Sequence, residues 1–500
     1  MNNLLNDIII VGGGTAGWMT ASGLSVLLPK NKYNITLVES DLIGTIGVGE
    51  ATIPPIRQFN RVVNIDEQKF MKRTGATFKL GIEFHNWRVS GEHYFHPFGK
   101  FGKSFDGLPF HQYWLRSKHH GSKINLGDYS LCEVMSRSNK FAPDSQDPKS
   151  VRSTSGYAYH LDAGLYAKFL REKSERNGVN RIEGKISTVN LRDTDGFIES
   201  VALDSGQVID GDFFIDCSGF RGLLIEEALK SGYEDWSDLL PCDRALAVPS
   251  KSVGATKPYT MSIAHNAGWQ WRIPLQHRTG NGHVYCSKFT SDDEATHTLL
   301  SNLEGEALSE PRPLKFMTGR RKKFWNKNCV AIGLSAGFLE PLESTSIHLI
   351  QMAISQLVKL MPDHQSNQAE IDEFNNFFTR EYEVIRDFLI LHYHVNEREE
   401  PFWAYCRNME IPESLKQRIE LFKSRGRLHI EQDNLFKLDS WLAVMYGQGI
   451  EPRSYDPMTE NSDQEKIKKQ MAHVHSAFIK ETNNMPSHDQ FIQRNCKANL

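Results

Sequence analysis

The sequence lacks the marks of a secreted, membrane-spanning or nucleic-acid-binding protein. Its 500 residues hold seven scattered cysteines and no CxxC pair, so neither a disulfide framework nor a metal site is predicted. The net charge is -3, whereas nucleic-acid binders usually carry a strong positive charge. No apolar run is long enough to span a bilayer, and the N-terminus lacks signal-peptide features. These absences favour a cytoplasmic protein with reduced thiols and with no nucleic acid, membrane or metal as partner.

The composition is that of a large folded chain, with 39% hydrophobic and 24% charged residues. Its length is typical of two or three modules, or of one elaborated domain. From the motifs below and a later shift toward helical patterns, we divide the chain into residues 1–360 and 361–500. The one dense basic run, Arg320 to Lys323, precedes an apolar strand and is interpreted as a solvated turn.

A glycine loop near the N-terminus predicts a nucleotide site. Residues 7–11 form a continuous β-branched run typical of a buried parallel strand. Gly12, Gly14 and Gly17 follow in the GxGxxG pattern, and the sequence then becomes helical. In this pattern the first glycine allows a tight turn, the second lets a pyrophosphate approach the backbone, and the third packs the helix on the strand. Thr15 and Ala16 lie in the same loop, where the helix N-terminus offers free N–H groups to phosphates.

The context of this loop strengthens the prediction. A second strand ends at Glu39, about 20 residues after the last glycine, where an acid commonly binds ribose hydroxyls. Two later segments, 213–220 and 329–337, read as short strands that run into glycine turns. They favour FAD over NAD by analogy with FAD monooxygenases. The sequence contains no second GxGxxG after a strand, and therefore no obvious NAD(P)H domain.

Four stretches together resemble the flavin-dependent tryptophan halogenases. They are GGGTAGWMTA, IGVGEATIP, WQWRIP and FLEPLESTSI, at residues 12–21, 46–54, 269–274 and 338–347. The similarity continues through 401–408 and 439–449, and so covers nearly the whole chain. It implies an α/β fold: a Rossmann-like, monooxygenase-type FAD core with a mostly helical C-terminal substrate region.

The resemblance also implies a reaction. FADH2 supplied by a separate reductase reacts with O2 to give a flavin hydroperoxide, and chloride or bromide is oxidised to hypohalous acid. The acid travels through a tunnel to an electron-rich aromatic. The cofactor would also contact Gly47, Ala51, Leu334 and Ile347, which lie in or near the shared stretches. A transient contact with the reductase and a homodimer are family-level expectations.

Lys79 and Glu343 match the family's catalytic lysine and glutamate. Phe78, Leu80, Ile82 and Phe84 alternate with Lys79, so one continuous strand is predicted, and without the resemblance Lys79 would be interpreted as a solvated strand residue. Its ammonium could donate a hydrogen bond to hypohalous acid, and its neutral amine could form a haloamine; the sequence leaves both open. Glu343 could stabilise a cationic intermediate and accept the ring proton, or serve only as an acid at a helix start.

The halide site of the family uses backbone N–H groups of a Thr-Gly pair, which here reads Thr345-Ser346. The serine keeps the N–H, but it resists a positive φ and its side chain crowds close approach. The preference between chloride and bromide is therefore left open.

In WQWRIP, Trp269 and Trp271 share one face of a predicted strand. The resemblance makes them a wall between flavin and substrate that only the small oxidant passes. The alternative is that both indoles are ordinary core residues.

The chain beyond residue 360 reads as helical, with a helix expected to open at Pro412 and Glu413 and to end near Gly426. His392 and His394 lie two apart on one helix, do not share a face, and are interpreted as structural. No segment matches the amino-acid clamp of tryptophan-specific members, so the substrate is indole, tryptophan or a related aromatic. A flavin hydroxylase and a catalytically silent FAD-binding protein remain the alternatives.

Overall fold

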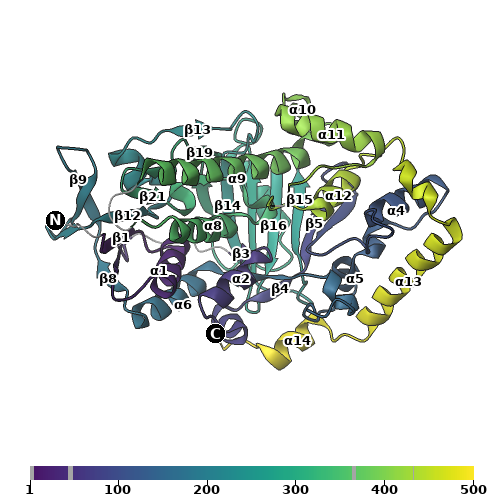
Figure 1. Cartoon of the computed structure of the whole chain (residues 1–500), viewed down its shortest axis with the longest axis horizontal. Helices are drawn as coiled ribbons and strands as arrows, with labels where there is room; N and C mark the ends of the chain where they lie inside the picture. The colour runs from purple at the N-terminus through teal and green to yellow at the C-terminus, as the bar shows by residue number, and fades with distance from the viewer. Residues whose placement is uncertain (1–4, 43–48, 363–366, 432, 500) are drawn as a thin grey trace.

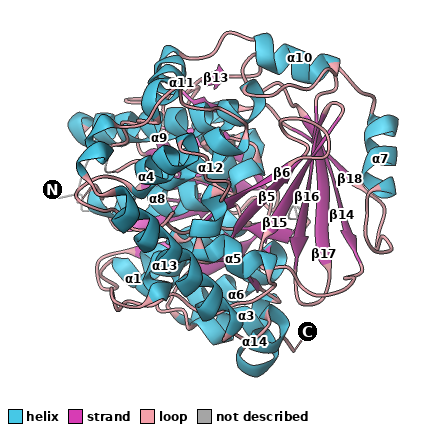
Figure 2. Ribbon diagram, turned by 90° about the vertical axis from the view of Figure 1, so that its right-hand side faces the viewer, coloured by secondary structure: helices cyan, strands magenta, loops and turns pink. Residues whose placement is uncertain are grey.

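Two large sheets, covered by helices, organise the chain in a computed structural model that describes residues 5–42, 49–362, 367–431 and 433–499. Figure 1 shows a smaller sheet near the N-terminus on the left, with the C-terminal helices on the right. In Figure 2 the larger sheet fans out on one side, and most helices gather on the other. The arrangement is α/β, as predicted.

The smaller sheet is the nucleotide-type sheet. Its order is β20-β21-β12-β1-β2-β8, and all neighbours are parallel except β20 and β21. The strands in that order span Trp325–Asn326, Cys329–Ala331, Phe213–Asp216, Asp7–Val11, Asn34–Glu39 and Asn180–Glu183. Ile8 to Val11 are all buried, because helices cover a parallel sheet on both faces. The helix α1 (Thr15–Leu27) leaves this sheet and packs against α6 (Ala163–Arg176) and α8 (Ser346–Lys359).

The larger sheet has seven strands in the order β18-β14-β17-β16-β15-β5-β6. They span Arg312–Lys315, Arg244–Ser250, Thr279–Tyr285, Gly268–Pro274, Thr260–His265, Gly81–His85 and His93–Pro97. All neighbours are antiparallel except β15 and β5. WQWRIP forms most of β16, near the middle of this sheet, and its two indoles are buried.

Three small sheets complete the strands. The first, β3-β7-β4, joins Gly49–Ala51, Ala158–Asp162 and Thr77–Lys79. The other two are β11-β10-β9 (Val208–Asp210, Ile198–Leu203, Ile186–Leu191) and β13-β19-β22 (Tyr233–Asp235, Gly319–Arg321, Gly337–Phe338).

The described chain beyond residue 366 is helical, as the pattern predicted. The long α9 (Gln368–His394) buries one stripe, including Phe378, Ile385 and Phe388. It is followed by α10 (Pro401–Asn408), α11 (Glu413–Arg425), α12 (Leu438–Gly447), α13 (Gln464–Asn483) and α14 (His488–Asn495). The expected end of α11 is confirmed: Gly426 caps it with a left-handed φ of 63°. The division of the chain into 1–360 and 361–500 stays a prediction.

The remaining helices lie before residue 302: α2 (Pro55–Val62), α3 (Glu67–Thr74), α4 (Phe110–His119), α5 (Leu131–Arg137) and α7 (Asp292–Ser301). Within the described ranges, no helix combines the length and apolar character needed to cross a membrane. The cysteines form no disulfide, and all seven are buried.

Two local predictions were wrong. The alternation around Lys79 is not one strand: β4 ends at Lys79 and pairs with β7, whereas β5 begins at Gly81 in the seven-stranded sheet. The basic run is not a solvated turn at its start, because Arg320 and Arg321 are buried in β19. Each finds a carboxylate, Glu234 at 2.6 Å and Glu226 at 2.7 Å. Burial of arginine is tolerated where such a partner is present.

Candidate functional site

The glycine loop has a shape that leaves room for a phosphate group. Gly12 adopts a φ of +112°, and a Cβ there would lie 2.3 Å from the carbonyl oxygen of Cys217. A Cβ on Gly17 would lie 1.8 Å from the carbonyl oxygen of Gly12, so α1 packs on the strand only without it. A Cβ on Gly14, by contrast, would meet nothing within 4 Å. The space beside Gly14 is open, at the N-terminus of α1 where Thr15 and Ala16 follow.

Glu39 ends β2 beside this loop, as predicted, and is already paired. Its Oε1 accepts from Arg181 at 2.6 Å and lies 3.5 Å from Arg171, and its Oε2 accepts from the Trp18 indole at 3.3 Å. The two arginines fix the direction of the carboxylate, which leaves Oε2 the less engaged oxygen. A ribose hydroxyl could therefore be bound only in addition to, or in exchange for, these contacts.

Two further segments meet the loop. Leu334 lies in a 3₁₀ turn, Gly333–Ser335, in which Gly333 approaches Ala16 so closely that a Cβ would come within 2.7 Å. Ile347 is buried in the first turn of α8, which packs on both α1 and this turn. Ala51 is buried at the end of β3, opposite His160. Gly47 lies outside the described residues.

Polar groups along α8 suit an additional molecule. The hydroxyl of Thr345, Nδ1 of His348 and both amide atoms of Gln351 are buried without a hydrogen-bond partner. Burial of unpaired polar atoms costs about 1–3 kcal/mol each, which a bound polar group would relieve. Together with the open space at Gly14, these orphaned atoms fit a large polar cofactor lying between the loop and α8.

Thr345 and Ser346 open α8, as N-cap and first helical residue. The helix has no side-chain cap, so its first N–H groups are available to an anion. Ser346 does not need a positive φ, because it is helical; the residue that adopts one is Ser344, at 59°. Ser346 therefore carries no backbone strain from a positive φ. It differs from the family's glycine only by the bulk of its side chain.

Lys79 is completely buried, so its interpretation as a solvated strand residue was wrong. Its Nζ donates to Oγ of Ser344 at 2.8 Å and lies 5.0 Å from the centre of the Phe98 ring. Burial lowers the pKa of Lys79 to about 7, an effect that the negative charge of Glu343 opposes. Near neutral pH the amine is therefore poised between its charged and neutral forms.

Glu343 is also completely buried, and two histidines face it. Nδ1 of His96, on β6, lies 2.9 Å and 3.0 Å from its two oxygens, and Nε2 of His392, on α9, lies 2.9 Å from Oε1. Burial by itself would raise the pKa of Glu343, but His96 and His392 outweigh it and hold the pKa at about 2. Glu343 precedes Ser344, so the chain brings the predicted lysine and glutamate to one turn.

The tryptophan pair forms a buried aromatic wall on β16. The ring centres of Trp269 and Trp271 are 6.0 Å apart, and a Cβ on Gly282 would strike the Trp271 ring. Nε1 of Trp269 donates to Oε2 of Glu340 at 3.0 Å, and Tyr393 donates to the same oxygen at 2.5 Å. Nε1 of Trp271 is buried without a partner.

Sequence reasoning missed several of these residues. His392, interpreted as structural, contacts Glu343, whereas His394 binds the carbonyl of Cys406. A signal existed: His392 follows Phe388 by four residues on the buried stripe of α9, where a polar residue needs a partner. His96 and Ser344 gave no comparable signal. In the ranges that the structure covers, no group of three or more His, Cys, Asp or Glu could hold a metal.

A cavity of about 600 Å³ has neither Lys79 nor Glu343 in its lining. Its lining includes Lys100 and Phe101, which follow Phe98 closely along the chain, and Leu442 of α12. The backbone N–H of Phe101 donates to Oδ1 of Asp439, also in the lining, at 2.9 Å.

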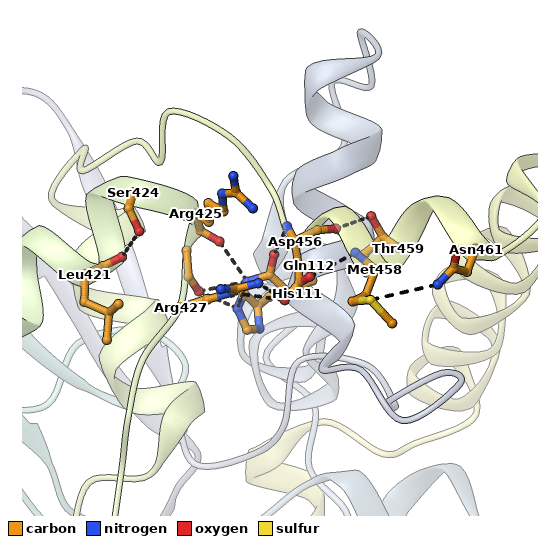
Figure 3. A network of polar contacts seen from close by, with 11 residues as sticks. His111, Gln112, Leu421, Ser424, Arg425, Arg427, Asp456, Met458, Thr459 and Asn461 are labelled. Carbon is orange, nitrogen blue, oxygen red and sulfur yellow. Dashed lines mark hydrogen bonds and ion pairs between the residues drawn. The ribbon is translucent and has the colours of Figure 1, made fainter.

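Polar contacts tie α4 to the C-terminal segments around Gly426 and Asp456 (Figure 3). Nε2 of His111 donates to the carbonyl of Gly426 at 2.8 Å, and the amide of Gln112 donates to the same oxygen at 3.0 Å. The backbone N–H of Asp456 donates to Gln112, and the Asp456 carboxylate pairs with Arg427 at 2.9 Å. Burial lowers the pKa of His111 to about 4, so this link stays neutral at physiological pH.

Comparison with known proteins points to one group. A family model described as tryptophan halogenase matches residues 7–464. A tryptophan 6-halogenase of Streptomyces albogriseolus is 35% identical over 491 residues, which cover 91% of each chain. A tryptophan 7-halogenase of Lentzea aerocolonigenes is 34% identical over 494 residues, which cover 91% of this chain and 92% of that one.

Solved structures agree. A flavin-dependent halogenase from Xanthomonas campestris superposes with a TM-score of 0.95 at 46% identity, covering 99% of both chains. A flavin-dependent halogenase from Brevundimonas sp. BAL3 superposes with a TM-score of 0.94 at 44% identity, covering 98% of this chain and 99% of that one.

Proposed function

The chain belongs to the tryptophan halogenase family, and from that premise we propose that it halogenates indole, tryptophan or a related electron-rich aromatic. It is an enzyme that uses FAD, reduced by a separate flavin reductase, together with O2 and chloride or bromide. The observation that carries the proposal is the buried turn at which Lys79 binds Ser344 next to Glu343. Reduced flavin and O2 supply the oxidising equivalent; the residues of this chain direct it.

In this proposal Lys79 activates the oxidised halogen. Its ammonium donates a hydrogen bond to the oxygen of hypohalous acid, which weakens the oxygen–halogen bond as the ring attacks the halogen. The pKa near 7 also leaves a fraction of neutral amine that could carry the halogen as a haloamine. Either way the oxidant is held at the buried amine of Lys79, beside the Phe98 ring, and does not diffuse freely.

Glu343 acts on the ring. Its ionised carboxylate stabilises the positive charge that develops on the aromatic as the carbon–halogen bond forms, and it then accepts the proton from the same carbon. Ionisation is supported by the two imidazoles that face it. The atoms balance: hypohalous acid and an aromatic C–H give the aryl halide and water.

The other assigned residues bind and separate the reactants. Gly12, Gly14, Thr15, Ala16, Gly17, Glu39, Gly47, Ala51, Leu334 and Ile347 are proposed to hold FAD, which the open space at Gly14 and the orphaned groups of α8 accommodate. The N–H groups of Thr345 and Ser346 would bind the halide. Trp269 and Trp271 form the wall that keeps the organic substrate away from the flavin, and so suppress hydroxylation. A homodimer and a cytoplasmic location are further proposals, based on family resemblance and on reduced cysteines.

The test is a reaction containing FAD, a flavin reductase, NADH, O2 and bromide, with indole and tryptophan in competition, analysed by mass spectrometry. Wild type should give a monobrominated product, and Lys79→Ala should lose it by about 10²–10⁴-fold. The variant should bind FAD as tightly as wild type, which separates chemistry from folding. Product at wild-type yield in the variant would mean freely diffusing hypobromite and would remove the role of Lys79. A hydroxylated product formed without halide would favour the hydroxylase alternative.

A further inference from the structure

Three residues from distant parts of the chain meet in a dry cluster: His96, Glu343 and His392. Their side chains are 3%, 0% and 0% exposed. They come from β6, from the turn before α8 and from α9, so the tertiary fold alone brings them together. A carboxylate without water needs donors from the protein, because an isolated buried charge is prohibitively costly.

The tautomer of His392 is fixed by its other nitrogen. Nδ1 lies 2.8 Å from the carbonyl oxygen of Phe388, one turn earlier on α9. A carbonyl can only accept, so Nδ1 must carry a hydrogen. In a neutral imidazole Nε2 would then present a lone pair to Oε1 of Glu343, 2.9 Å away. Two lone pairs at that distance in a dry site repel each other, so one additional proton must lie on the His392–Glu343 pair.

The position of that proton follows from the other contacts of Glu343. His96 Nδ1 is almost equidistant from the two carboxylate oxygens, a geometry that suits a charged acceptor with both oxygens engaged. The contact of His392 is close in distance without the angle of a hydrogen bond, so its attraction rests on charge. A protonated His392 supplies that charge, whereas a protonated Glu343 would need a straight hydrogen bond to Nε2.

Two further titratable groups interact with Glu343, Lys79 on β4 and Tyr94 on β6, and Asp439 on α12 interacts with His96. Lys79 interacts with Glu343 electrostatically, and its Nζ is directed to Ser344. The hydroxyl of Tyr94 is buried without a partner, and burial together with Glu343 raises the pKa of Tyr94 well above its usual value, so it stays neutral. Neither group contacts Oε1 of Glu343, so His392 is the charged group that faces this oxygen, at 2.9 Å.

We propose that His392 is a positioning residue whose imidazolium, opposite His96, keeps Glu343 ionised and aimed at the substrate. Its catalytic meaning rests on the proposed halogenation, but the charge state of the cluster does not. The low pKa of Glu343 agrees with this assignment. A histidine in place of a neutral donor also allows the pair to keep its proton while the carboxylate receives another from the ring.

The charge state can be measured without any turnover. Nitrogen-15 NMR of the intact protein, labelled at its 19 histidines, distinguishes protonated from unprotonated ring nitrogens. The signal of His392 is assigned as the one missing in His392→Gln. At pH 7 we expect both nitrogens of His392 to be protonated in wild type, and Nε2 to lose its proton in Glu343→Gln. An unprotonated Nε2 in wild type would overturn the proposal, because the proton would then lie on Glu343.

Kinetics provide the second readout. With His392→Gln the acid limb of the kcat profile should move up by about one pH unit, because Glu343 loses a charged partner. The rate at pH 3 should then fall about twofold, and the loss should vanish by pH 6, where Glu343 is ionised in both proteins. His394→Gln is the matched control on the same helix and should behave as wild type. A kcat profile in His392→Gln that matches that of wild type would also overturn the proposal. If wild type gave no halogenated product at all, the NMR measurement would decide the proposal by itself.

Discussion

The nucleotide side and the reactive side of this protein are built in opposite ways. The former is almost continuous in sequence: β1, the glycine loop, α1 and β2 occupy residues 7–39. The latter gathers Lys79, His96, Glu343 and His392 from four elements far apart in the chain. The first site has an opening next to its glycines, whereas the second is closed around its charges.

The difference shows where each site obtains its chemistry. A phosphate site uses backbone N–H groups and a helix dipole, so glycine geometry is sufficient. The reactive side needs a carboxylate and an amine whose pKa values are both lowered, that of Lys79 by burial and that of Glu343 by its two histidine neighbours. The predictions below disturb one side and leave the other intact, from the largest expected effect to the smallest.

Gly17→Ala should damage the nucleotide side most. The added Cβ would lie 1.8 Å from the carbonyl oxygen of Gly12, so α1 must move away from the loop. FAD affinity, measured by titration of flavin fluorescence, should fall about 100-fold, roughly 2.7 kcal/mol. Gly164→Ala in α6 is the control, because its Cβ would meet only Oδ1 of Asp162 at 3.4 Å. Wild-type affinity in Gly17→Ala would contradict the role of the loop.

The same contrast explains what the sequence could predict. The strand, helix and acid follow one another as expected, although α1 begins at Thr15, three residues before the expected start after Gly17. Lys79 and Glu343 were found through family motifs, but their burial was not, since alternation around Lys79 is equally typical of a half-exposed strand. The break between β4 and β5 arises because the two strands pair with different sheets. The contact of His96 with Glu343 arises from packing between segments far apart in the sequence. Neither has a local signature.

Lys79→Met should change how stability depends on pH. The unfolded lysine has a pKa of 10.5 and the buried one about 7. Between these values the unfolded chain binds one more proton, so wild type gains about 1.4 kcal/mol of unfolding free energy per pH unit relative to the variant. Below pH 7 the penalty of burying the ammonium is complete, and the methionine variant should be the more stable protein. Urea unfolding from pH 6 to 10 measures this difference, and Lys168→Met, at an exposed lysine, is the control. If the unfolding free energies of wild type and Lys79→Met changed in parallel with pH, the lowered pKa of Lys79 would be refuted.

Glu340→Leu should loosen Trp269, one of the two residues proposed to separate flavin and substrate. It removes the oxygen that accepts from Trp269 and Tyr393, and leaves two buried donors unpaired at about 1–3 kcal/mol each. We expect Trp269 to shift and the yield of halogenated product per NADH to fall about fivefold, since ~1 kcal/mol corresponds to a factor of about five in the population of the wild-type conformation. Glu340→Gln is the matched control, because its carbonyl oxygen still accepts from both donors.

The pH dependence distinguishes anchoring from acid–base chemistry at Glu340. Burial raises its pKa to about 7, against the lowering effect of Tyr393 and Trp269. If the residue served as an acid or base, glutamine would be as harmful as leucine and would alter the pH profile. If it only anchors Trp269, glutamine should retain the wild-type yield at every pH and leucine should lose it uniformly. Equal yields in all three proteins would mean that the indole needs no anchor, and that Trp269 is held by its aromatic neighbours alone.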